Sequence, residues 1–125
     1  MEIEIVGKEV VDAAVMVHRE LGVGLLESVY EIVLEYELDR RGLRVQRQVP
    51  VHISYQGKEF SEAFRIDIMV EEMVVLELKS VEEVSRAHFK QTLTYLRLAD
   101  KRLGFLLNFG APTMKEGITR IVNKL

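Results

Sequence analysis

The chain has 125 residues, no cysteine, 48% hydrophobic residues and a formal charge of −3. This length suits one domain, residues 1–125, with a core of its own, and the lack of cysteine excludes a disulfide framework and a thiolate metal site. No apolar run approaches the ~20 residues of a membrane span, and the N-terminal MEIEIVGKEV is too acidic for a signal peptide, so we expect a cytoplasmic protein without a membrane partner.

The first third of the chain has helical periodicity. A helix is expected from Lys8 to Leu21, where apolar residues recur at Val10, Ala14, Val17 and Leu21. Gly22-Val23-Gly24 ends it. The stretch LLESVYEIVLEYELDRRG then predicts a second helix, which Gly42 closes.

Three strands are expected next. The first covers residues 45–55 and has one apolar face interrupted by Arg47, while Pro50 indicates a position at the edge of a sheet. A turn at Gln56-Gly57-Lys58 leads to a second strand from Phe60 to Val70. The third strand runs from Met73 to Ser80.

The last third alternates between helix and strand. A helix is expected from about Val84 to Leu98, followed by a buried strand at 103–109, LGFLLNF. A final amphipathic helix carries Met114, Ile118, Ile121, Val122 and Leu125. The order α-α-β-β-β-α-β-α gives an α/β fold with a four-stranded mixed sheet flanked by helices, in which a right-handed crossover makes the third and fourth strands parallel.

Charged residues interrupt two of the apolar strands. Asp67 lies in FRIDIMV, and Glu77 and Lys79 lie in VVLELKS, where they share one strand face. A two-residue loop at 71–72 would place Asp67 opposite Leu76, whereas a three-residue loop at 71–73 would place Asp67 opposite Glu77. Only an odd-length loop or a bulge therefore brings the two carboxylates together.

Two carboxylates about 5 Å apart across a hairpin repel each other unless a cation lies between them. Mg²⁺ suits such a pair, because it binds one or two carboxylates, keeps several waters and leaves room for a phosphate oxygen. The alternative is a set of surface ion pairs among Arg65, Asp67 and Lys79 on a solvated sheet face.

Asp67, nine intervening residues and then Glu77-x-Lys79 together resemble the PD-(D/E)xK nuclease superfamily. GLLESVY at 24–30 is similar to the Gly-x-x-Glu-x-x-Tyr signature of the GxxExxY protein family within it. The likeness extends over HRELGVGLLESVYE, RRGLRVQRQVPV, FRIDIMV, VVLELKSV, HFKQTLTYLRL and LGFLLNFG, although Val23 stands where many relatives carry proline. The resemblance implies a restriction-endonuclease-like core and metal-dependent hydrolysis of phosphodiester bonds in nucleic acid, with DNA favoured over RNA.

The resemblance also assigns roles. Asp67, Glu77 and the main-chain carbonyl of Leu78 would hold Mg²⁺ or Mn²⁺, and Glu27 would complete the acidic set. Lys79 is expected to stay protonated, because neighbouring carboxylates favour its charged form, and to orient water and neutralise charge on the phosphate.

Two further residues match the Gln-x-x-x-Tyr element of the exonuclease-like branch. Gln91 and Tyr95 are four residues apart on a helix, so they point the same way and would hydrogen bond to the flanking phosphate. Alternatively, Tyr95 is a core aromatic, Gln91 an exposed helix residue and Glu27 an ordinary first-turn acid. His18 is expected to be a satisfied core residue rather than a ligand.

The acidic net charge opposes binding to a polyanion, although a metal that neutralised three acids would bring the formal charge to zero. Arg40, Arg41, Arg44 and Arg47 form either a phosphate track or a solvated loop. A homodimer or a partner protein would widen so small a binding surface. The competing interpretation is a non-catalytic module on the same scaffold that binds nucleic acid or protein.

Overall fold

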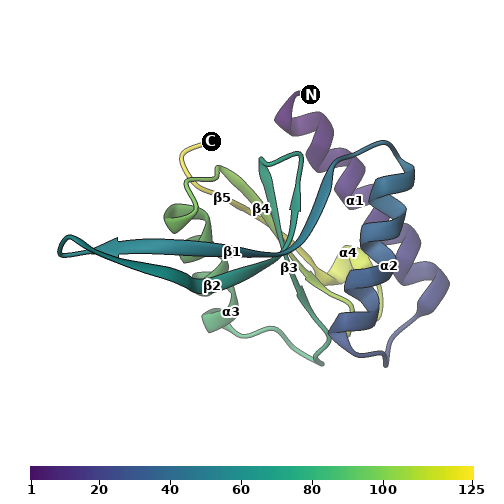
Figure 1. The fold of residues 1–125 in the computed structure, drawn as a ribbon. Helices are drawn as coiled ribbons and strands as arrows, with labels where there is room; N and C mark the ends of the chain where they lie inside the picture. The colour runs from purple at the N-terminus through teal and green to yellow at the C-terminus, as the bar shows by residue number, and fades with distance from the viewer.

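The computed structural model describes residues 1–125. Its elements in chain order are α1 (Ile3–Leu21), α2 (Glu27–Arg40), β1 (Val45–Tyr55), β2 (Lys58–Val70), β3 (Val74–Lys79), α3 (Arg86–Leu98), β4 (Leu103–Asn108), α4 (Met114–Gly117) and β5 (Ile118–Val122) (Figure 1). The strands form one sheet in the order β1-β2-β3-β4-β5. β3 and β4 are parallel and joined through α3, and the other neighbours are antiparallel, which confirms the mixed sheet.

The C-terminal segment differs from the prediction. The helix expected over residues 114–125 ends at Gly117, and residues 118–122 form a fifth strand that pairs with β4. Ile118 and Ile121 would share one face of a helix, but they pack against opposite sides of the sheet, as residues three apart in a strand do. The β-branched run Ile118, Thr119, Ile121 and Val122 also favours a strand.

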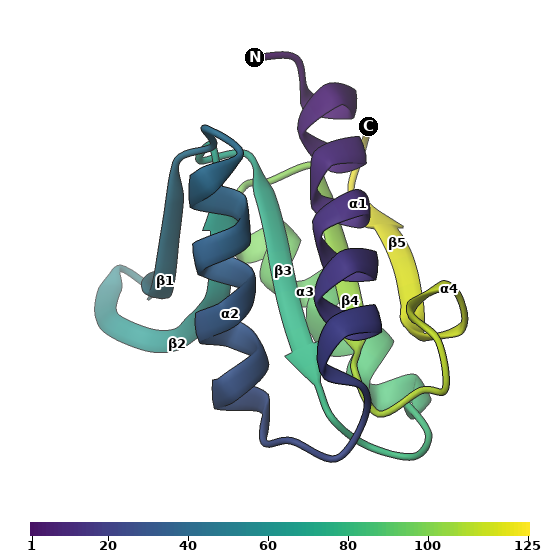
Figure 2. The ribbon, with the colours of Figure 1, turned by 90° about the vertical axis from the view of Figure 1, so that its right-hand side faces the viewer.

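The molecule has three layers. α1 and α2 cover one face of the sheet, and α3 covers the other (Figure 2). Along β3, Val74, Leu76 and Leu78 pack against the α1–α2 layer, whereas Val75 packs against Leu96 of α3. Because strand side chains alternate, Glu77 and Lys79 belong to the α3 face.

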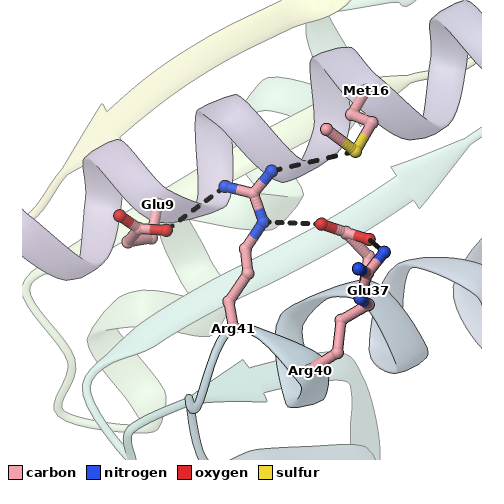
Figure 3. Close-up of polar contacts among 5 residues, drawn as sticks. All are labelled: Glu9, Met16, Glu37, Arg40 and Arg41. Atoms are coloured by element: carbon pink, nitrogen blue, oxygen red, sulfur yellow. Dashed lines mark hydrogen bonds and ion pairs between the residues drawn. The ribbon is translucent and has the colours of Figure 1, made fainter.

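An ion-pair network holds α1 against the end of α2 (Figure 3). Arg41 Nε donates to Glu37 at 2.7 Å, and Arg41 Nη1 donates to Glu9 of α1 at 3.2 Å. Arg40 Nη1 contacts the other oxygen of Glu37 at 3.3 Å. Glu37 is largely buried, so its two arginine partners replace most of the hydration that the carboxylate has lost.

The β1–β2 hairpin extends beyond the rest of the sheet as an arm (Figure 1). β1 lies at the sheet edge, as Pro50 predicted. β2 pairs with β3 only through residues 68–70, and the part of β2 that precedes them belongs to the arm. In this part, Phe64 stacks on Tyr95 of α3, with ring centroids 4.0 Å apart. Gln48, opposite Asp67 in the β1–β2 register, has a left-handed backbone with φ of 52° at this point of departure. None of the helices has the length and hydrophobicity of a membrane-spanning segment.

Candidate active site

The register of β2 and β3 brings the two predicted carboxylates together. Val70 pairs with Val74, so the loop between them has three residues, and Ile68 pairs with Leu76. Continuing this register by one residue places Asp67 opposite Glu77. The predicted odd-length loop is therefore confirmed.

Asp67 takes the place of a missing backbone partner. The β2–β3 ladder ends at Ile68 and Leu76, and the Leu78 N–H that would have continued it donates to Asp67 Oδ2 at 2.8 Å. Since the N–H and C=O of one residue in an antiparallel ladder point to the same neighbour, the Leu78 carbonyl faces the same side. Two oxygen atoms, one from Asp67 and one from the Leu78 carbonyl, are thus directed to the place where β2 leaves the sheet.

Glu77 is a buried carboxylate without a full set of partners. Its side chain belongs to a residue only 6% exposed, and Glu77 Oε1 makes no hydrogen bond. The pKa of Glu77 is raised to about 10, first by burial and then by the negative charge of Asp67, and the positive charge of Lys79 opposes the rise. Without a cation, Glu77 therefore keeps its proton at neutral pH.

This arrangement fits a divalent cation. An unpartnered carboxylate oxygen beside a second carboxylate is costly, and a bound Mg²⁺ or Mn²⁺ would satisfy both groups. The donors available are oxygens, which Mg²⁺ prefers. Glu77 and Asp67 are the only two acidic side chains at this place, since the structure contains no group of three or more His, Asp or Glu side chains that could hold a metal ion.

Lys79 lies on the same strand face as Glu77, and its charge favours the ionised form of that carboxylate. Lys79 is half-buried and has no carboxylate within 4 Å, unlike most arginines of the chain. Its ammonium group is therefore free to meet an anionic ligand.

The α3 helix brings a phenol to the carboxylates. Tyr95 is half-buried, and its pKa is raised mainly by burial and further by the negative charges of Glu77 and Asp67. The hydroxyl is thus protonated and can donate a hydrogen bond. Gln91 lies one turn earlier on α3 and is exposed.

Glu27 stands apart from the other predicted acids. It is the first residue of α2, and its side chain is exposed and makes no hydrogen bond or ion pair. The alternative set of surface ion pairs is also absent, since Arg65 pairs with Glu62 and not with Asp67.

Glu31, one turn after Glu27, is an acid that the sequence interpretation missed. It is buried, accepts from Arg47 Nη1 at 3.0 Å and accepts from Gln48 Nε2 at 2.9 Å. Its pKa is raised, first by burial, and the charge of Asp67 contributes. The available signal was its position next to Tyr30 and one turn before Leu34, which places Glu31 on the buried side of α2.

Asn108 is a second residue that the interpretation missed. It pairs with Lys79 in the parallel register and is buried. Its side-chain amide accepts from Val81 N at 3.1 Å and Gly110 N at 3.0 Å, and donates to Val81 O at 2.9 Å. A Cβ on Gly110 would lie 2.1 Å from Val81 O, so only glycine permits this approach. Asn108 thereby fixes the path of the chain after Lys79.

The residues around Glu27 have structural partners. Tyr30 Oη donates to Gly22 O at 2.6 Å and accepts from Leu25 N at 3.2 Å, and its ring stacks on Phe109. Ser80 Oγ donates to Leu25 O at 2.7 Å, which joins this loop to the end of β3. His18 Nε2 lies 2.8 Å from Ala111 O in a buried position, as expected for a satisfied core residue.

The arginine cluster does not form a free phosphate track. All four members are paired: Arg40 with Glu37, Arg41 with Glu9 and Glu37, Arg44 with Glu72, and Arg47 with Glu31 and Glu35. Arg44 reaches the β2–β3 loop, at the end of β3 opposite to Lys79. The cluster therefore connects elements of the fold, and Arg47, which lies opposite Ile68 and pairs with Glu31, is beside the strand that carries Asp67.

Comparison with known proteins agrees with this geometry. Residues 4–121 match the model of a family described as the PD-(D/E)XK nuclease superfamily. The chain has no significant match among curated proteins and none among solved structures.

Proposed function

The chain belongs to the PD-(D/E)XK nuclease superfamily, and from this premise we propose that it is a Mg²⁺- or Mn²⁺-dependent nuclease that hydrolyses phosphodiester bonds of DNA. The observation that carries the proposal is the unpartnered Glu77 Oε1 beside Asp67. A buried carboxyl group with an unpartnered oxygen, beside a second acid, costs stability and serves no packing purpose, whereas it suits a cation site.

Asp67, Glu77 and the Leu78 carbonyl would hold the ion. When bound, the ion supplies positive charge to the scissile phosphate and lowers the pKa of the attacking water. Asp67 is already oriented by the Leu78 N–H, so its carboxylate does not have to be ordered on binding. Glu27 would belong to this set only through water, because its exposed side chain shares no cluster with the other two acids.

The chain's own donors would act on the phosphate. Lys79 would orient the attacking water and neutralise negative charge that develops on the phosphate oxygens. Tyr95 would donate a hydrogen bond to the phosphate from its protonated hydroxyl, and Gln91 would donate from its exposed amide.

We also propose membership of the GxxExxY family within the superfamily. Support comes from the signature positions Gly24, Glu27 and Tyr30. Tyr30 holds the loop that carries Gly24, whose φ of 102° favours glycine, and this loop leads into Glu27.

The experiment is a cleavage assay on a mixed panel of plasmid, linear single strands, a branched DNA junction and an RNA hairpin, each with Mg²⁺ and with Mn²⁺. Wild type is compared with Glu77→Gln and with Glu83→Gln, which changes an exposed glutamate without partners. We expect metal-dependent cutting of DNA by wild type and Glu83→Gln and none by Glu77→Gln. Cutting that survives in Glu77→Gln, or metal binding without cutting of any substrate, would contradict the proposal; the second outcome would indicate the non-catalytic module.

A further inference from the structure

Two consecutive residues of β1 bind the same carboxylate of α2. Arg47 Nη1 donates to Glu31 Oε2 at 3.0 Å, and Gln48 Nε2 donates to Glu31 Oε1 at 2.9 Å. Neighbouring side chains of a regular strand point to opposite faces of the sheet, so a regular β1 would not bring both donors to α2. Gln48 is the residue that departs from regular geometry, because its backbone is left-handed, with φ of 52°.

Both strands of the arm change the face of their side chains at this level. On β2, Ile68 packs in the core beneath α1 and α2, whereas Ile66 packs in the core beneath α3. Residues two apart share one face of a regular strand, so the change falls on Asp67 between them. β1 makes the same change at Gln48, which lies opposite Asp67: the residue before it reaches α2, and Val49 after it packs in the core beneath α3.

The change of face coincides with the place of Asp67 in the candidate site. Pairing of β2 with β3 stops at Ile68, and Asp67, the next residue outward, accepts from the Leu78 N–H at 2.8 Å in place of a main-chain partner. The position of the Asp67 carboxylate thus depends on where the arm leaves the sheet. On β1 that point is Gln48.

The left-handed conformation of Gln48 requires support. It is unfavourable for a residue with a Cβ and persists only where surrounding contacts hold it. The Gln48 side chain bonds to the buried Glu31, and the Gln48 carbonyl accepts from the exposed Arg65 at 3.3 Å. The pKa of Glu31 is raised, first by burial, and the charge of Asp67 contributes, so Glu31 lies within range of that charge. Glu31 is therefore the buried support of Gln48.

We propose that Glu31 is a positioning residue, which fixes the left-handed backbone of Gln48 and thereby holds Asp67 in the site. The inference rests on the proposed function, because Asp67 is one of the two acids assigned to the ion. In this role Glu31 touches neither the ion nor the substrate. Its effect passes through the main chain of β1, so a substitution that favours the same main chain should replace it.

The test places glycine at position 48, because glycine adopts a left-handed backbone without the penalty of a Cβ. Wild type is compared with Glu31→Gln, Gln48→Ala, Gln48→Gly and the double variant Glu31→Gln/Gln48→Gly. The matched control is Glu37→Gln, since Glu37 is a similarly buried glutamate that two arginines hold near the other end of α2. Thermal melts verify that each variant is folded.

The first measurement is hydrogen exchange at the Leu78 amide in the metal-free protein, because this amide donates to Asp67. We expect exchange about 10-fold faster in Glu31→Gln and in Gln48→Ala. Gln48→Gly, the double variant and Glu37→Gln should exchange as wild type does. Mn²⁺ affinity should follow the same order, with a loss of about 10-fold in the two affected variants.

Unchanged exchange at Leu78 in Glu31→Gln would overturn the proposal. Exchange in the double variant as fast as in Glu31→Gln would also overturn it, because Glu31 would then act by its charge or by direct contact and not through Gln48. If Glu31→Gln does not fold, Gln48→Ala and Gln48→Gly decide the question, since equal exchange in these two variants would contradict a requirement for the left-handed backbone.

The measurements also separate this proposal from the proposed function. Exchange at Leu78 that follows the expected order, in a protein that binds no Mn²⁺ and cuts no nucleic acid, would refute the nuclease and support the link from Glu31 to Asp67. Equal exchange at Leu78 and equal Mn²⁺ affinity in Glu31→Gln and in a wild type that cuts DNA would refute the positioning role alone.

Discussion

Asp67 and Glu77 lie opposite each other at the point where the β2–β3 ladder ends, and only Asp67 has a hydrogen-bond donor. The Leu78 N–H satisfies Asp67, while Glu77 is left buried with an unpartnered oxygen. Burial, together with the negative charge of Asp67, raises the pKa of Glu77 to about 10. A bound cation would therefore change the protonation of Glu77 more than that of Asp67.

Stability of the metal-free protein should fall as pH rises. Between the ordinary pKa of 4.5 and about 10, native Glu77 keeps a proton that the unfolded chain has released, so unfolding is favoured more at each higher pH. Glu77→Gln cannot release a proton. We expect its free energy of unfolding to exceed that of wild type by about 2–4 kcal/mol at pH 7.5, with the difference vanishing near pH 4.5.

Urea unfolding in the presence of a chelator, at pH values from 4.5 to 8, measures this difference. Glu83→Gln serves as the control, since its exposed side chain should track wild type at every pH. A difference between Glu77→Gln and wild type that stays constant with pH would contradict the buried, proton-holding carboxyl.

Lys79→Met should lower kcat by about 100-fold or more while the protein still binds Mn²⁺. The aliphatic stem is kept, but the positive charge that neutralises the phosphate is lost. Steady-state kinetics and Mn²⁺ titration measure the two effects, with Lys8→Met as a matched change of an exposed, unpaired lysine on α1. Unchanged kcat in Lys79→Met would remove this residue from the proposed chemistry.

Tyr95→Phe should keep the fold and lose a phosphate contact. The ring can still stack on Phe64, so the melting temperature should change little. Loss of one hydrogen bond to a charged group corresponds to about 1.5–3 kcal/mol, or roughly 10- to 100-fold in kcat/KM. If kcat/KM stayed at the wild-type value, Tyr95 would be only a packing residue, as the alternative interpretation held.

Asn108→Ala should impair the site more than it impairs the fold. The side chain makes three hydrogen bonds that fix Val81 and Gly110 after Lys79, so its removal should release the end of β3. We expect kcat to fall about 10-fold or more with KM nearly unchanged, and faster amide exchange at Val81. The matched control is Asn123→Ala, which removes an amide bond to Lys101 O after β5; similar losses of kcat in both variants would show that Asn108 acts only through stability.

Much of this arrangement could be predicted from the sequence because local patterns determined it. Alternation in FRIDIMV and VVLELKS placed the charged residues on strand faces, and loop parity then decided that Asp67 and Glu77 meet. The parallel β3–β4 pair followed from the length of the α3 crossover. These features depend on period and connection length, which a sequence displays directly.

The features that the sequence did not predict are those that contacts between distant residues determine. Residues 114–125 have a plausible helical pattern, yet Ile118 and Ile121 fill cores on opposite faces of the sheet and the strand prevails. The sequence left the role of the arginine cluster open, because some of its carboxylate partners, such as Glu9 and Glu72, are distant in sequence. Asn108 was missed for the same reason, since its partner Val81 lies 27 residues earlier.

The most direct test of the central claim is Mn²⁺ binding, measured by isothermal titration calorimetry on wild type, Asp67→Asn, Glu77→Gln and Glu83→Gln. If Asp67 and Glu77 hold the ion, wild type and Glu83→Gln bind Mn²⁺ with equal affinity and release protons on binding, because Glu77 must ionise, while the other two variants lose at least 10-fold in affinity. Equal binding by all four proteins, or no binding by wild type, would contradict the account.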